Sequence, residues 1–268
     1  MALDPTFAAE LRASLASFGA RSGAASVPNA PGKALELWLQ LKLATVAQTM
    51  RHWTVTLRDG SGAPLSSGSW ILRANPQGLG PLAPSSPGWV HLAYTPPWVP
   101  PPGRDLEIHG GLQWLGRSGA SHECDVSILP AIVADQIRSD GGGCPQGLPV
   151  LMLECKDKTS KGNLDEIRQT LARVFDLAII SQASGLGVGR ILHSPNLPGW
   201  GGRSSQYRAY FRLGLFGIVR AGEFQTGAKS MNRHYHIKGF DRIYDTSSDA
   251  VPRLESAFRR LLTTSLQM

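Results

Sequence analysis

The sequence predicts an α/β fold in which helices flank a mixed central sheet. Three observations carry this prediction. An apolar run at 148–153 has strand length, residues 121–129 alternate apolar and polar side chains, and residues 164–180 repeat apolar side chains at helical spacing. Alternation with a period of two is typical of a half-buried strand, whereas spacing of three and four residues indicates an amphipathic helix.

The composition allows one large domain, or a core with a smaller appendage. The chain has 268 residues, of which 42% are hydrophobic, so it can bury a sizeable core. No apolar run approaches the ~20 residues of a membrane helix, and the N-terminus lacks the pattern of a signal peptide. Three cysteines are too few for a disulfide framework. We therefore expect the reducing cytoplasm as the compartment.

Positive charge is concentrated in the C-terminal third. The formal net charge is +7, and residues 186–268 hold twelve Lys or Arg against five Asp or Glu, so the whole excess lies there. This distribution predicts a polyanionic partner, most commonly a nucleic acid. The alternative is a basic surface that has no partner.

Residues 1–32 are expected to form a short helix followed by a linker. Asp4 as the N-cap and Pro5 at the first helical position favour a helix over 5–18. Residues 19–32 are rich in Gly, Ala, Ser and Pro, which is typical of a linker.

A second helix is predicted over 33–50, with an acid on its apolar stripe. One face carries Glu36, Leu39, Leu43 and Val46. A glutamate there is unusual, and two interpretations stay open. It serves a site, or it lies at the edge of the stripe and reaches solvent.

Strands at 52–58 and 67–73 are predicted to form a hairpin around residues 59–62. The proline-rich stretch 75–103 follows, and we expect a long ordered loop or insertion there. Three aromatic residues are expected to fix this stretch to the core, and the alternative is that they stack on bases. They are Trp89, Tyr94 and Trp98.

The next segments are predicted to hold the strands of a site and their connection. Residues 105–117 favour a strand with a bulge at Gly110–Gly111. The alternating strand 121–129 follows after a tight turn. Residues 135–147 are polar and glycine-rich, so we expect a loop that leads to the apolar strand at 148–153.

The C-terminal part is predicted to continue with a glycine-rich turn into a strand at 185–192, a basic strand at 233–238 and a closing helix at 250–266. We expect residues 33–194 to form the core. Residues 195–268 are expected to form a basic α+β segment that packs on this core.

Charged residues end the apolar strand. Side chains alternate along a strand, so Glu154 and Lys156 share one face and Cys155 takes the other. If strand 121–129 pairs with this strand, Asp125 converges on the same place. Two carboxylates that share a divalent cation, with a lysine beside a water, suit metal-assisted hydrolysis of a phosphodiester. The alternative is an ordinary ion pair at a strand end.

This arrangement resembles the PD-(D/E)xK nuclease superfamily, which has a restriction-endonuclease-like fold. The motif is Asp125, a gap, and then Glu154, Cys155 and Lys156. The match covers residues 32–193, a little over half of the chain. The context agrees, because an apolar strand leads into the motif and a helix follows it.

The resemblance implies roles for single residues. Asp125 and Glu154 would bind Mg²⁺ or Mn²⁺, with the backbone carbonyl of Cys155 as an additional ligand. Lys156 would assist the attacking water, and Glu36 matches an auxiliary acid that the first core helix often carries. The residues expected to contact nucleic acid are Lys158, Lys161, Gln169, Arg233 and Lys238.

The implied activity is that of a Mg²⁺-dependent endonuclease, with DNA as the favoured substrate and a prokaryotic defence, restriction or repair setting. One departure is that Cys124 stands where the superfamily has its name-giving proline. The alternative function is a non-catalytic nucleic-acid-binding module on a nuclease-like fold. A homodimer and an activating partner or ligand both stay open, since the sequence decides neither.

Overall fold

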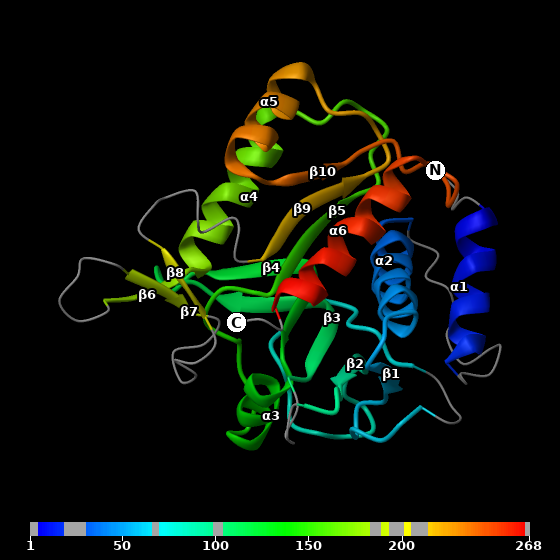
Figure 1. The fold of residues 1–268 in the computed structure, drawn as a ribbon, viewed down its shortest axis with the longest axis vertical. Coiled ribbons are helices and arrows are strands. Elements are labelled where there is room, and N and C mark those ends of the chain that lie inside the picture. Colours follow the sequence, from blue (N-terminus) through cyan, green and yellow to red (C-terminus); the bar gives the residue numbers. More distant parts are fainter. Residues whose placement is uncertain are drawn as a thin grey trace.

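The computed structural model shows an α/β protein in which helices cover both faces of a mixed sheet (Figure 1). The predicted α/β class is confirmed. The described residues are 5–18, 31–65, 70–98, 104–182, 189–192, 201–204 and 214–265. None of the helices in these ranges is long and apolar enough to cross a membrane.

Among the described residues, seven strands form the central sheet in the order β1-β2-β3-β4-β5-β9-β10. Strands β1 to β5 are antiparallel, whereas β5, β9 and β10 are parallel to one another. The bounds are Trp53–Arg58 (β1), Trp89–Tyr94 (β2), Leu106–Leu115 (β3), Ser121–Pro130 (β4), Leu151–Lys156 (β5), Leu215–Arg220 (β9) and Lys238–Phe240 (β10). A second, smaller sheet contains Ile179–Gln182 (β6), Gly189–Leu192 (β7) and Gly201–Ser204 (β8).

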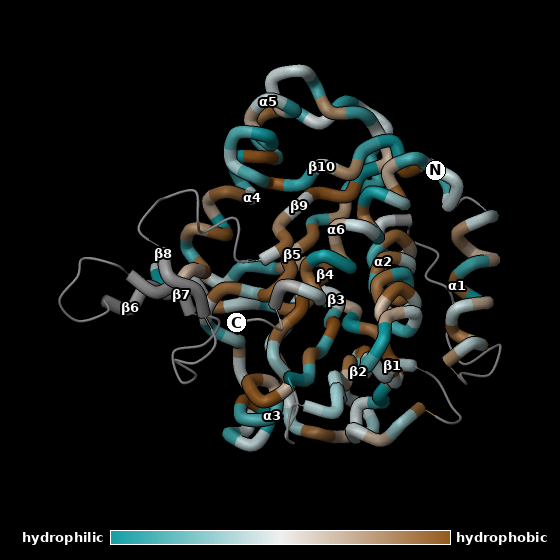
Figure 2. The backbone as a smooth tube through the Cα atoms, in the orientation of Figure 1, coloured by the Kyte–Doolittle hydropathy of each residue, from teal (hydrophilic) through white to brown (hydrophobic). Residues whose placement is uncertain are grey.

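The helices divide between the two faces of the central sheet. One face carries α1 (Pro5–Ser17), α2 (Pro31–Gln48) and α6 (Ala250–Ser265). The other carries α3 (Ala131–Ser139), α4 (Leu164–Leu177) and α5 (Thr226–Tyr235). Figure 2 shows that hydrophobic residues follow β5 and β9 through the middle of the molecule, so these strands are apolar where helices cover them.

Helix α2 is held by packing on several sides. Leu37, Trp38 and Leu39 follow one another, yet all three are buried, so they face different neighbours. One neighbour is α1, whose Phe7 packs edge-on against Trp38 with ring centroids 4.9 Å apart. The predicted helices at 5–18 and 33–50 are therefore confirmed within a few residues, and Glu36 lies on a fixed element.

Strands β3 and β4 change faces at the position of the predicted bulge. Ile108 contributes to the core under α2, whereas Leu112 contributes to the core under α4. Residues an even number apart should share a face, so the strand turns over between them. Gly111 has a φ of +57° and does not pair with the residue opposite, Asp125. The register is the same on both sides, so no residue is inserted and the predicted bulge is not formed. Both strands deviate together instead, and Asp125 leaves the regular ladder.

The proline-rich stretch contains a strand of the central sheet. Strand β2 pairs with β1 and β3, whereas residues 70–73 of the predicted hairpin form no strand and residues 67–69 lie outside the described residues. Trp89 is buried and Tyr94 packs against the core, as expected. Trp98 is 68% exposed and contacts the ring of His52 edge-on at 5.2 Å, so it touches the body of the protein without being buried in its core.

Two further predicted elements are wrong. Residues 135–139 belong to α3, which forms because Val133 and Ala134 are buried against the core under α4. The predicted basic strand at 233–238 begins instead as the last turn of α5, where His236 (φ +61°) reverses the chain before β10. Helix α5 forms because Ala228 and Asn232, which are four positions apart, are both buried on one side of it.

The C-terminal part completes the sheet and is not a separate layer. Strand β9 lies between β5 and β10, and Leu215, Phe240 and Phe258 share one core with α2. The predicted division at residue 195 therefore does not separate two bodies among the described residues. Helix α6 confirms the predicted closing helix. The glycine-rich turn at 185–188 lies outside the described residues.

Candidate active site

The candidate site lies where β4 and β5 separate. Their backbone pairing runs from Ile128–Leu151 to Val126–Leu153 and stops there. Beyond it, the backbone N–H of Cys155 donates a hydrogen bond of 2.7 Å to Oδ2 of Asp125. A side chain has therefore replaced the backbone as the link between the strands. This link holds the Asp125 carboxylate against the backbone that joins Glu154 to Lys156.

Glu154 is buried and is neutralised by two cations. Lys156 Nζ lies 3.5 Å from its Oε2, and Arg173 of α4 donates a hydrogen bond to its Oε1. Arg173 also donates to the backbone carbonyl of Glu123 at 3.2 Å, so it links α4 to β4. A buried carboxylate requires such partners, because losing its hydration costs several kcal/mol.

Two other acids have raised pKa values. Burial, and then the negative charge of Glu154, raise the pKa of Asp125 to about 6, against the opposing effects of the Cys155 N–H and Lys156. Burial also raises the pKa of Glu36 to about 7, and the charge of Asp125 adds to the rise. A cation bound nearby would favour the ionised form of both carboxyl groups.

Lys33 approaches this cluster from the first turn of α2. Its Nζ lies 2.8 Å from Oε2 of Glu36 and 3.9 Å from Oε1 of Glu123. Gly110 makes the close approach of α2 to β3 possible, because a Cβ there would lie 2.1 Å from the amide nitrogen of Gln40 on α2.

A buried ionic network lies behind Gly110. Arg138 donates two hydrogen bonds to Glu107, at 2.9 and 2.6 Å, and the ring of His109 contacts the same carboxylate at 2.8 Å. Arg73 donates to the carbonyl of Gly110 at 3.2 Å. Burial lowers the pKa of His109 to about 4, so the ring is neutral at physiological pH. The network fixes the strand beside the candidate site.

The structure brings together the predicted catalytic residues. Asp125 interacts electrostatically with both Glu154 and Glu36, and Lys156 lies beside Glu154. Glu36 has a side chain that is only 12% exposed, so it is not the solvated residue of the alternative interpretation.

The residues predicted to contact nucleic acid are distributed differently. Lys158 and Lys161 are exposed after β5, and Gln169 is exposed on α4, one turn before Arg173. Arg233 on α5 and Lys238 on β10 lie elsewhere, because β10 is separated from β5 by β9. The structure does not bring these two together with the carboxylates.

Sequence reasoning missed Lys33 and Arg173. Lys33 precedes Glu36 by three residues, a helical spacing at which opposite charges pair. Arg173 follows Gln169 by four residues on α4, and only the packing of that helix on the sheet directs it to Glu154. The sequence therefore contained a local signal for Lys33, namely its spacing from Glu36, but none for Arg173.

The donor chemistry of the cluster suits a hard divalent cation. Carboxylate and backbone carbonyl oxygens are the ligands that Mg²⁺ and Mn²⁺ prefer. In the conformation observed, however, Arg173 and Lys156 supply the counter-charge of Glu154. Within the part of the chain that the structure describes, no group of three or more His, Cys, Asp or Glu is arranged to hold a metal ion. A cation would therefore require Glu154 to exchange Arg173 for metal.

Comparison with known proteins identifies no relative. No family model matches the chain, and neither a curated protein nor a solved structure is detectably similar to it. The function must therefore be argued from the geometry of the site.

Proposed function

We propose that the protein is a divalent-metal-dependent nuclease that hydrolyses phosphodiester bonds, with DNA as the expected substrate. One observation supports this most. Asp125 and Glu36, two acids with raised pKa values, lie at the point where β4 and β5 separate, beside Glu154 and Lys156. Clustered acids with raised pKa values are typical of functional sites, because burial and like charges destabilise their ionised forms in the folded protein.

The proposed roles follow from the contacts. Asp125 and Glu154 would hold Mg²⁺ or Mn²⁺, with the carbonyl of Cys155 as an additional ligand. When bound, the ion supplies Lewis-acid polarisation of the phosphoryl oxygen. The Lys156 ammonium, which lies 3.5 Å from Glu154, stabilises negative charge that develops on the phosphate. Glu36, with a pKa of about 7, can accept a proton from water near neutral pH.

A plasmid-nicking assay with Mg²⁺, with Mn²⁺ and with EDTA tests this function. Wild-type protein should nick only with metal, and Asp125→Asn and Glu154→Gln should each abolish nicking. The matched control is Asp165→Asn, which changes an exposed acid on α4 that pairs with Arg168. The same assay is repeated with single-stranded DNA and with RNA as substrates. Absence of metal-dependent cleavage of all these substrates, or full activity of Glu154→Gln, would refute the proposal.

A second candidate is a nucleic-acid-binding module without catalytic activity. The ion pair between Glu154 and Arg173 favours it, because this pair satisfies the acid without metal. Under this function, nucleic acid binds equally well with Mg²⁺ and EDTA and is never cut. Mg²⁺ would then leave the melting temperature unchanged, whereas a metal that binds only the folded state raises it.

A further inference from the structure

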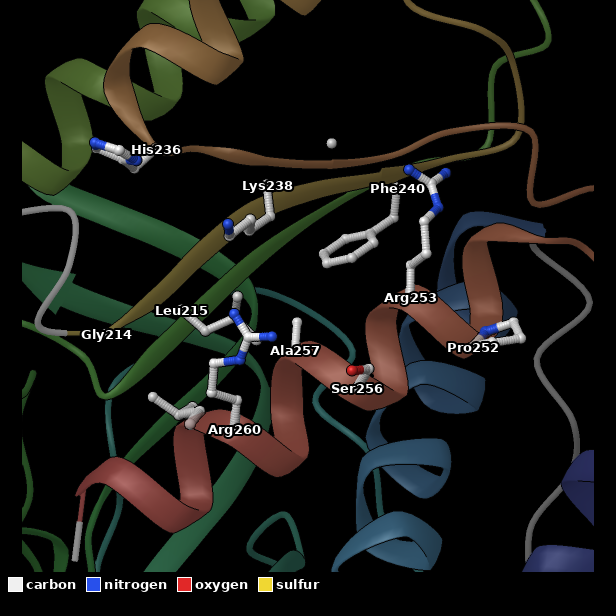
Figure 3. Close-up of a pocket in the computed structure, with 12 residues that line it drawn as sticks. Gly214, Leu215, His236, Lys238, Phe240, Pro252, Arg253, Ser256, Ala257 and Arg260 are labelled. Atoms are coloured by element: carbon white, nitrogen blue, oxygen red, sulfur yellow. The ribbon is translucent and has the colours of Figure 1, made fainter. Parts of the chain in front are cut away.

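A basic pocket lies between β10 and α6, away from the candidate active site. It has a volume of about 590 Å³, and its lining includes four basic residues, which are His236, Lys238, Arg253 and Arg260. Among the described residues, no Asp or Glu lines the pocket. In Figure 3 the side chains of Arg253 and Arg260 rise from α6 toward β10, and Lys238 extends from β10. The pocket is therefore positive on two sides.

The two arginines lie on the same face of α6. They are seven residues apart, which is two helical turns and about 10 Å along the axis. Lys238 faces them from β10, which ends the central sheet in the described part of the chain. An extended anion that runs along α6 could therefore contact several cations in succession.

Nearby acids compensate this charge only in part. Asp241 lies 3.7 Å from Arg253, but it is also 3.7 Å from Lys229, so two cations share one carboxylate. Glu255 of α6 pairs instead with Lys42 of α2 at 3.0 Å. Lys238 has no ion pair within 4.0 Å among the described residues. The positive charge of Lys238 is therefore left in the pocket without a carboxylate partner among the described residues.

The apolar lining is packed into the protein. Phe240 and Leu215 are each only 4% exposed, and both belong to the core shared with α2. A buried ring cannot stack on a base, so recognition by stacking is excluded for Phe240. The exposed lining residues are Lys238, Arg253, Arg260, Ser256 and Pro252, and His236 is half-buried. Such a lining recognises phosphates and does not read bases.

We propose that the basic pocket between β10 and α6 binds the phosphodiester backbone of a nucleic acid, independently of base sequence. The positive charge of the pocket is an observation that predicts a polyanion of any kind. The choice of a nucleic acid as that polyanion rests on the proposed nuclease function. The pocket revises one expectation from the sequence. Lys238 belongs to the binding surface, but Arg233 lies on α5 and does not line it.

Fluorescence anisotropy in EDTA tests this proposal without cleavage. The probes are a labelled single-stranded DNA and the corresponding duplex, and the proteins are wild type, Lys238→Ala/Arg260→Ala and the control Arg233→Ala. We expect the double variant to bind roughly ten-fold more weakly, with a salt dependence flatter by about two units, because each phosphate contact releases counterions. The control, which removes an exposed cation outside the pocket, should retain wild-type affinity.

Lys238→Glu provides a second variant that keeps the test decisive if the double variant unfolds. This side chain is exposed and makes no ion pair among the described residues, so reversing its charge should leave the melting temperature unchanged. Wild-type affinity and salt dependence in Lys238→Glu and the double variant would overturn the pocket assignment. Equal competition by polyglutamate would overturn the choice of nucleic acid.

The two proposals fail separately. If the protein binds DNA through the pocket but never cuts it with metal, the nuclease function is wrong and the pocket stands. If it cuts DNA but the pocket variants bind normally, only the pocket assignment is overturned.

Discussion

Replacing Glu36 with glutamine should change how the stability of the protein depends on pH. The Glu36 side chain is 12% exposed, and its pKa is raised from 4.5 to about 7 by burial and by the charge of Asp125, although Lys33 lies 2.8 Å away. Glutamine has nearly the same shape and can still accept a hydrogen bond from Lys33. The substitution therefore removes the titration and keeps the packing.

The sign of the effect follows from proton counting. Between pH 4.5 and 7, folded protein keeps a proton on Glu36 that the unfolded chain has released. The free energy of unfolding therefore falls as pH rises through this window, by about 1.4 kcal/mol for each pH unit. Wild type should accordingly lose roughly 2 to 3 kcal/mol more than Glu36→Gln between pH 5 and pH 8. Asp125, with a pKa of about 6, adds a similar decline to both proteins.

Urea unfolding in EDTA at pH 5, 6, 7 and 8 measures this difference. Glu223→Gln is the matched control, because Lys229 and Arg242 hold the pKa of Glu223 at about 2, below the range studied. The control should therefore follow the pH dependence of wild type. Parallel curves for wild type and Glu36→Gln would show that Glu36 is an ordinary ionised surface acid, and Asp125 alone would remain as an acid with a raised pKa at the site.

Three further predictions concern the surroundings of the site. Glu107→Leu should lower the free energy of unfolding by about 3–5 kcal/mol in denaturant titrations, because it leaves the buried Arg138 with only the exposed carboxylate of Asp135 as a partner. Arg173→Met should strengthen Mg²⁺ binding roughly ten-fold in calorimetry, since Glu154 loses the cation that competes with metal; unchanged affinity would exclude that competition. Gly217→Ala should cost about 1–3 kcal/mol of stability, because its Cβ would lie 2.6 Å from the carbonyl oxygen of Lys238 on β10; a wild-type melting temperature would contradict this packing.

The sequence by itself determined the elements whose pattern is local. Apolar spacing was sufficient for α2 and α4, the pair Asp4–Pro5 indicated α1, and alternation was sufficient for β4. The apolar run before Glu154 located β5, and the pair Gly110–Gly111 located the irregularity in β3. Each of these signals lies within one segment, and a periodic pattern reflects which side of that segment is buried.

Local patterns misled where burial came from distant partners. The basic residues of segment 233–238 suggested a strand, but residues 233–235 belong to α5, which forms because its other face packs at Ala228 and Asn232. Strand β2 lies within a proline-rich stretch that has few strand signals, yet β1 and β3 complete its hydrogen bonding on both edges. In both cases tertiary packing outweighed intrinsic preference.

The candidate site divides in the same way. Alternation predicted that Glu154 and Lys156 share a face, and the 3.5 Å contact between them follows from one strand. The cluster of Asp125, Glu36 and Arg173 required three further elements, β4, α2 and α4, to meet β5 at the point where β4 and β5 separate. Only the tertiary structure decided this, because burial and neighbouring charge set a pKa, and both depend on residues that are far apart in the chain.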